Sequence, residues 1–182
     1  MKKLFIIITA FMVLSSCVTT KEAKLSRAEL RNEKKLANQE QIKNAVESKK
    51  FIIKLDRLYL SYGGMADLYP RYNYIIIDGD KAIINTAYFG RQYDIRRIAA
   101  IDIFGRNMNY VVTKDISRGV YKIKMTVRNA GSNAFDVYLD ISKNGYCNAS
   151  VSSLKIDYIR YSGFIESIKG ETNTTPPDGD VI

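Results

Sequence analysis

Few residues in this chain have the type and spacing that catalysis needs. The sequence contains no histidine, the commonest general base and the commonest transition-metal ligand in proteins. Ser152, Ser153 and Ser162 therefore have no histidine to activate them. Asp136 and Asp140 stand four residues apart, roughly 13 Å along a strand, whereas a glycosidase pair needs roughly 5 to 10 Å. Carboxylate pairs between strands stay open, but we expect no catalytic residues and no enzyme.

A metal site is not expected either. Asp78-Gly79-Asp80 resembles the start of a calcium loop, but position 82, where a third ligand would stand, is alanine. The same three residues between two β-branched runs are typical of a hairpin turn. Without histidine or a dense carboxylate cluster, the sequence predicts neither a metal ion nor a cofactor.

Tyrosine is the residue type that could bind a ligand. The chain has 13 tyrosines, and five of them cluster around one predicted loop. A tyrosine offers a stiff apolar ring and a hydroxyl group, which suit sugars and peptides. Tyrosine also favours strands, so the alternative is that these rings simply cover the sheet. The candidate binding patch is Tyr59, Tyr62, Tyr69, Tyr72 and Tyr74.

The N-terminus carries an export pattern that ends in a cysteine. Lys2 and Lys3 precede an apolar run, residues 4–14, that is shorter than the roughly 20 residues a bilayer span needs. The run ends in Leu14-Ser15-Ser16-Cys17, which resembles the lipobox of bacterial lipoproteins. That resemblance implies cleavage before Cys17 and a lipid on its sulfur. The alternative is an ordinary secreted protein with a chance cysteine, which would leave an unpaired thiol at the terminus.

Charge and cysteine content limit the partners. The net charge is +9, and loss of Lys2 and Lys3 would leave 26 basic against 19 acidic residues, or +7. Such an excess favours anionic surfaces, but export argues against nucleic acid as the partner. Once Cys17 is lipidated, Cys147 has no disulfide partner, and we expect it to be a buried strand residue.

The elements follow from composition and periodicity. Residues 18–50 are charged and rich in helix formers, with apolar residues at helical spacing only near the end, at Ile42, Ala45 and Val46. We expect a flexible start and a helix that ends near Ser48. A tail from residue 169, rich in Thr, Pro and Asp, predicts disorder. The predicted organisation is a signal peptide (1–16), a lipid-anchored tether and helix (17–50), a β-domain (51–168) and a disordered tail (169–182).

From residue 51 the apolar period becomes two, with short spacing between runs. The apolar side changes near Arg57, which indicates a bulge, and residues 61–69 are expected to be a loop. Two runs, 98–104 and 106–113, are expected to be separate strands broken by Gly105. The alternation is clearest in two predicted strands, residues 121–128 and 135–141. There Asp136 and Asp140 are expected to pair with Lys122 and Lys124 across the strands. The predicted interior residues of these two strands are Tyr121, Ile123, Met125, Val127, Phe135, Val137, Leu139 and Ile141.

These eight or nine strands predict a mainly β fold. It is an antiparallel meander, either a barrel or a strongly curved sheet, preceded by one N-terminal helix.

Four stretches carry a family resemblance: residues 45–51, Leu55-Asp56-Arg57, residues 77–82 and residues 159–163. The mature length resembles a family of small lipoproteins of unknown function from Bacteroides-type bacteria, domain-of-unknown-function family 4251. The resemblance implies a lipocalin-like β architecture with a leading helix, and no established catalytic residues. The stretch 90–97 is more basic than the family pattern.

The functional expectation is a non-enzymatic, lipid-anchored envelope protein. It would bind a small molecule or a glycan, or would be a structural or accessory partner of another envelope protein. Val18 follows the cysteine, whereas enteric lipoproteins retained in the inner membrane have aspartate there. The resemblance therefore favours the outer membrane, with the domain facing the periplasm or the cell surface.

Overall fold

A computed structural model describes residues 19–60, 63–90 and 100–168, with side chains from residue 26 onward. The predicted signal peptide, Cys17, most of the basic stretch 90–97 and the predicted tail lie outside the described residues. The elements are helix α2 (Thr19–Ser48) and strands β1 (Lys50–Tyr59), β2 (Met65–Asp67), β3 (Tyr74–Asp78), β4 (Lys81–Ala87), β5 (Ala100–Asp115), β6 (Val120–Asn129), β7 (Ala134–Ser142), β8 (Tyr146–Ser153) and β9 (Ile159–Ser167).

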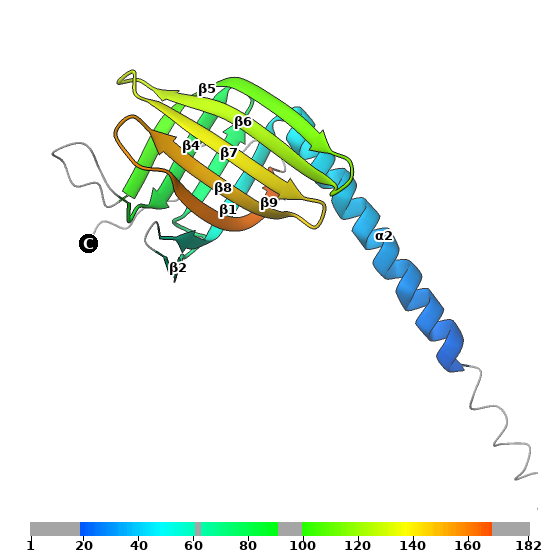
Figure 1. Ribbon diagram of the computed structural model, residues 1–182. Helices are drawn as coiled ribbons and strands as arrows, with labels where there is room; N and C mark the ends of the chain where they lie inside the picture. Colours follow the sequence, from blue (N-terminus) through cyan, green and yellow to red (C-terminus); the bar gives the residue numbers. More distant parts are fainter. Residues whose placement is uncertain (1–18, 61–62, 91–99, 169–182) are drawn as a thin grey trace, which may run out of the picture. The chain divides into compact units, whose positions relative to one another are not determined.

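The strands form an antiparallel eight-stranded barrel. Each strand from β3 to β8 pairs with the next in the chain, β3 also pairs with β1, and β1 pairs with β9 (Figure 1). The short strand β2 adds to the last residues of β1. The predicted mainly β meander with a leading helix is confirmed, and the β1–β9 pairing decides for a barrel over an open curved sheet.

Alternating residues fill the barrel as the sequence predicts. Seven of the eight predicted interior residues on β6 and β7 are at most 8% exposed, and Phe135 is partly buried against the same core. Lys122, Lys124 and Asp140 are exposed on the opposite face. Cys147 is fully buried, as expected of a strand residue.

Helix α2 ends at Ser48, where it was expected to end. The chain forms two compact units, and the boundary between them falls between Ala37 and Asn38. Within the second unit Ile42, Ala45 and Val46 are at most 5% exposed and belong to the barrel core. The Tyr110 hydroxyl donates to the Val46 carbonyl at 3.1 Å. No helix of the described chain has the length and hydropathy to cross a bilayer.

The junction of β1 and β9 is unusually tight. The register shifts between Leu55 and Arg57, so Asp56 is the extra residue of the predicted bulge. Gly163 lies opposite Leu55, and a Cβ on it would overlap the Lys54 carbonyl oxygen. Only glycine allows the two backbones to approach this closely.

Two predictions about strand limits were wrong. Strand β5 continues through Gly105, which pairs with Ala82 on β4 and with Asn129 on β6. This glycine allows close approach of the Arg128 backbone instead of ending a strand. The predicted loop 61–69 contains strand β2, because Leu58 and Tyr59 leave a free edge that Ala66 and Met65 pair with.

Gly163→Ala should destabilise the barrel by about 3 kcal/mol or more, because the added methyl group must push two paired backbones apart. Urea unfolding followed by circular dichroism measures the change. Gly131→Ala is the matched control, since its nearest neighbour would be 3.5 Å away. Equal stability of the two variants would contradict the close approach.

Val46→Ala should lower the free energy of unfolding by about 2 kcal/mol, because it leaves a cavity under the barrel. Leu36→Ala, on the same helix but 66% exposed, should change it by less than about 0.5 kcal/mol. Deletion of residues 21–33 should also leave the melting temperature nearly unchanged. A large loss from that deletion would show that the early helix is part of the fold.

Candidate functional site

A groove crosses the outer wall of the barrel over strands β6, β7, β8, β9 and β1. Its volume is about 750 Å³. In Figure 1 these strands lie side by side. The groove is lined by Tyr59, Lys122, Tyr138, Asp140, Asn148, Ala149, Ser150, Tyr158, Arg160 and Tyr161.

Strand register brings the lining together. One row runs from Tyr138 to Ser150, Arg160 and Tyr59 on successive strands. The neighbouring row runs from Lys122 to Asp140 and Asn148. Side chains directly opposite in antiparallel strands have Cβ atoms roughly 4.5–5.5 Å apart. Residues that are far apart in the sequence thus form one continuous outer surface.

Three tyrosine rings give the groove its apolar character. Tyr138 is 42% and Tyr158 is 56% exposed, and Tyr59 is half-buried. The Arg160 guanidinium lies 5.5 Å from the centre of the Tyr59 ring, and the Lys124 ammonium lies 5.6 Å from that of Tyr138. These cation–π contacts restrict the movement of the two rings.

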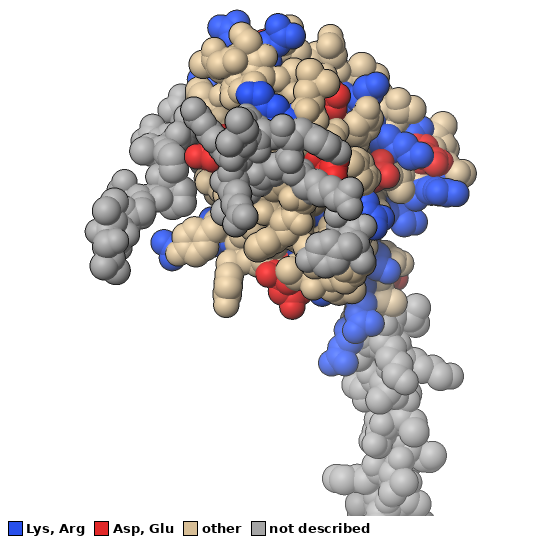
Figure 2. Space-filling model, turned by 60° about the vertical axis from the view of Figure 1, so that its left-hand side comes forward, with Lys and Arg blue, Asp and Glu red and all other residues tan. Residues whose placement is uncertain are grey.

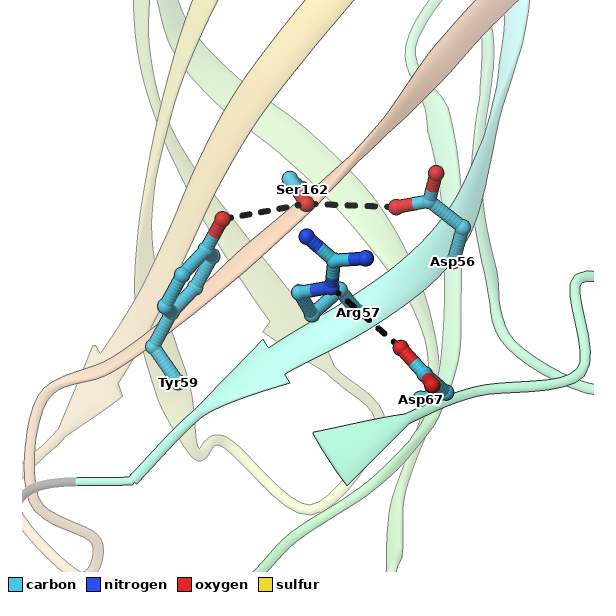
Figure 3. Close-up of polar contacts among 5 residues, drawn as sticks. All are labelled: Asp56, Arg57, Tyr59, Asp67 and Ser162. Carbon is cyan, nitrogen blue, oxygen red and sulfur yellow. Dashed lines mark hydrogen bonds and ion pairs between the residues drawn. The ribbon is translucent and has the colours of Figure 1, made fainter. Parts of the chain in front are cut away.

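A hydrogen-bond chain fixes Tyr59 at the end of the groove (Figure 3). The Tyr59 hydroxyl donates to Ser162 Oγ at 3.5 Å, and Ser162 Oγ donates to Asp56 Oδ1 at 3.2 Å. Beside this chain Arg57 Nε donates to Asp67 Oδ1 at 3.3 Å. Asp56 is the bulge residue, so the irregularity that allows β1 to meet β9 also supplies the acceptor that anchors Tyr59.

Ser162 and Cys147 have nucleophilic side chains, but both are buried and neither lines the groove. Ser162 is 2% exposed and its hydroxyl is committed to Asp56. Burial raises the pKa of the Cys147 thiol well above its ordinary value, so this thiol stays protonated and unreactive. Within the described ranges no three metal-ligating side chains gather at one place. Lys122, Asp140, Asn148 and Arg160 can instead donate or accept hydrogen bonds from a ligand that stacks on the rings.

The structure separates the five tyrosines of the predicted patch. Tyr59 lines the groove, whereas Tyr74 is 8% exposed and offers little surface to a ligand. Tyr69 and Tyr72 are 79% and 62% exposed between β2 and β3. Tyr62 lies outside the described residues. A binding role for this patch stays a prediction, carried by Tyr69 and Tyr72 outside the groove.

The predicted Asp–Lys pairs on β6 and β7 are wrong in detail. Asp140 does lie opposite Lys122, but Asp136 lies opposite Thr126 and accepts a hydrogen bond from its hydroxyl at 3.0 Å. Lys124 lies opposite Tyr138 and contacts its ring. Aspartates four residues apart cannot both lie directly opposite lysines that are two residues apart, so only one of the two predicted pairs can form in a regular ladder.

The sequence interpretation missed Tyr138, Tyr158 and Arg160. The turn at residues 143–145 would have set Tyr138 opposite Ser150, because a short hairpin fixes its register. The contact of Arg160 with Tyr59 depends on barrel closure, which no local pattern reveals.

Comparison with known proteins places the chain in a family. The family model described as "Domain of unknown function (DUF4251)" matches residues 33–165. The chain belongs to the DUF4251 family. This confirms the resemblance seen in the sequence.

The crystal structure of a DUF4251 protein from Bacteroides eggerthii has the same fold, with a TM-score of 0.61 at 11% identity. The match covers 72% of this chain and 88% of that chain. At this identity the likeness extends to the fold alone. No curated protein matches the sequence.

Proposed function

We propose that this DUF4251 protein is a lipid-anchored envelope protein whose barrel binds a small molecule or a glycan in the outer groove. The observation that carries the proposal is the groove lining, in which three tyrosine rings stand beside charged and amide side chains. Sugar rings pair an apolar face with a rim of hydroxyl groups, and this lining offers partners for both.

The charged side chains of the groove indicate which chemical class of ligand it would bind. Lys122 and Arg160 stand beside a single carboxylate, Asp140. A ligand with hydroxyl groups and at least one anionic group would satisfy both cations. The rings of Tyr138 and Tyr158 would stack on its apolar faces.

The anchor rests on the sequence at Cys17. A lipid there would hold the barrel at the outer membrane, facing the periplasm or the cell surface, and the helix would act as the tether. The same placement would serve the alternative role, an accessory partner of another envelope protein.

Tyr138→Ala and Tyr158→Ala should each weaken ligand binding by about tenfold or more, because each removes a stacking surface. Isothermal titration of the mature chain against a panel of neutral and acidic oligosaccharides measures the affinity. Both rings are exposed, so the melting temperature should stay within a few degrees.

Tyr69→Ala and Tyr72→Ala are the matched controls, because both are exposed tyrosines outside the groove. They should bind like the parent. If they lose binding and the groove variants do not, the predicted patch is the site and the groove proposal fails. If no oligosaccharide binds but cross-linking captures an envelope protein, the accessory role replaces it.

Cys17→Ser should abolish incorporation of labelled fatty acid and release the protein from the membrane fraction. Cys147→Ala is the control and should remain labelled, because its thiol is buried. Detergent partitioning of the Cys17→Ser variant like that of the parent would refute the anchor.

A further inference from the structure

A row of cations that have no ion-pair partner among the described residues crosses the barrel wall over β4, β5 and β6. Lys81 on β4 lies opposite Arg106 on β5, and Arg106 lies opposite Arg128 on β6. All three are exposed, and they alternate with the inward residues Ala82, Asn107 and Val127. Three like charges therefore stand side by side on three neighbouring strands. We call these three residues the cationic row.

This arrangement costs folding free energy unless something outside neutralises it. Like charges directly opposite in a sheet destabilise the pair. The adjoining acid, Asp78, is already paired with Lys50 at 3.8 Å. Among the described residues no ion pair joins a carboxylate to Lys81, Arg106 or Arg128. The row is therefore available to an anionic partner.

Exposed apolar side chains flank the cationic row on β5. Phe104 is 64% and Met108 is 43% exposed, two residues before and two after Arg106, so all three lie on the outer face. Val111, farther along β5, is 56% exposed. An acidic glycan or free phosphate would use the cations but would leave Phe104 and Met108 in water.

We propose that the cationic row with Phe104 and Met108 is a membrane-docking face that binds an anionic phospholipid surface. The cations would contact headgroup phosphates, while Phe104 and Met108 would enter the interfacial layer. Figure 2 shows Lys and Arg side chains scattered over the visible face, with some Asp and Glu among them, so net charge alone does not single out one face. What distinguishes this face is that three cations lie directly opposite one another across strands, beside exposed apolar side chains. This face is separate from the groove and does not depend on the proposed ligand.

The test is vesicle co-sedimentation of the mature polypeptide, residues 17–182 with Cys17→Ser, so that no lipid anchor contributes. Vesicles of phosphatidylcholine alone are compared with vesicles of roughly three parts phosphatidylcholine to one part phosphatidylglycerol, which carry negative charge. On the charged vesicles each surface cation should change the affinity about fivefold. We expect binding to the anionic vesicles alone, weakened by added salt.

The triple variant Lys81→Gln, Arg106→Gln, Arg128→Gln should lose about 100-fold of this affinity. Its melting temperature should be unchanged or higher, because like-charge repulsion is removed; a purely structural role would lower it. The control removes the same charge elsewhere, with Lys114→Gln, Arg118→Gln and Lys143→Gln, and should lose much less.

The variant Phe104→Ser tests whether the partner of the cationic row is a membrane or another polyanion. It should weaken vesicle binding about tenfold, whereas Ile116→Ser, a change at an 87% exposed turn residue, should leave it unchanged. The proposal is overturned if the two triple variants bind equally or if Phe104→Ser has no effect. It is also overturned if dextran sulfate binds the row while anionic vesicles do not.

Discussion

The contact of β9 with β1 at Gly163 is the constraint on which the barrel depends. Every other strand pair from β3 to β9 is between neighbours in the chain and is joined by a local connection. The β1–β9 pair instead brings together residues about a hundred positions apart, and such non-local pairing carries a large loop-closure cost. The bulge at Asp56 and the missing side chain at Gly163 allow it. Closure then pairs β1 with β9, two strands whose edges would otherwise be open to other chains.

Closure also determines where a ligand can bind. An eight-stranded barrel is just wide enough for side chains to fill it or for one small ligand. Here the interior is a single core that includes Tyr88 and Tyr161. The Tyr161 hydroxyl donates to the Ala87 carbonyl at 3.0 Å, and the Tyr88 hydroxyl accepts from the Asp157 backbone at 3.1 Å. The hydroxyl groups of these two interior tyrosines thus hydrogen-bond to the barrel's own backbone, and the proposed ligand site lies on the outer wall.

The sequence predicted what depends on local periodicity. Ile123, Met125, Val137 and Leu139 were predicted to face the interior because they alternate with charged residues, and Asp78-Gly79-Asp80 marked a hairpin. Gly105 was misread, because a glycine inside an apolar run can end a strand or permit close approach, and only the position of β6 distinguishes the two. The groove was missed for a related reason. Tyr59 and Arg160 become neighbours only when β1 closes on β9.

The two outer faces illustrate why outward positions carry the functional information. Inward residues are constrained by packing, so their identities report the core. An outward residue is free of that constraint. A residue type that lowers stability at an outward position therefore needs an explanation other than packing. The Tyr59 hydroxyl hydrogen-bonds to that of Ser162, which fixes a ring on the surface. On the other face, like charges lie directly opposite one another at Lys81, Arg106 and Arg128. The like charges oppose folding, which supports the proposed docking face, whereas the bond between Tyr59 and Ser162 positions a ring of the proposed groove.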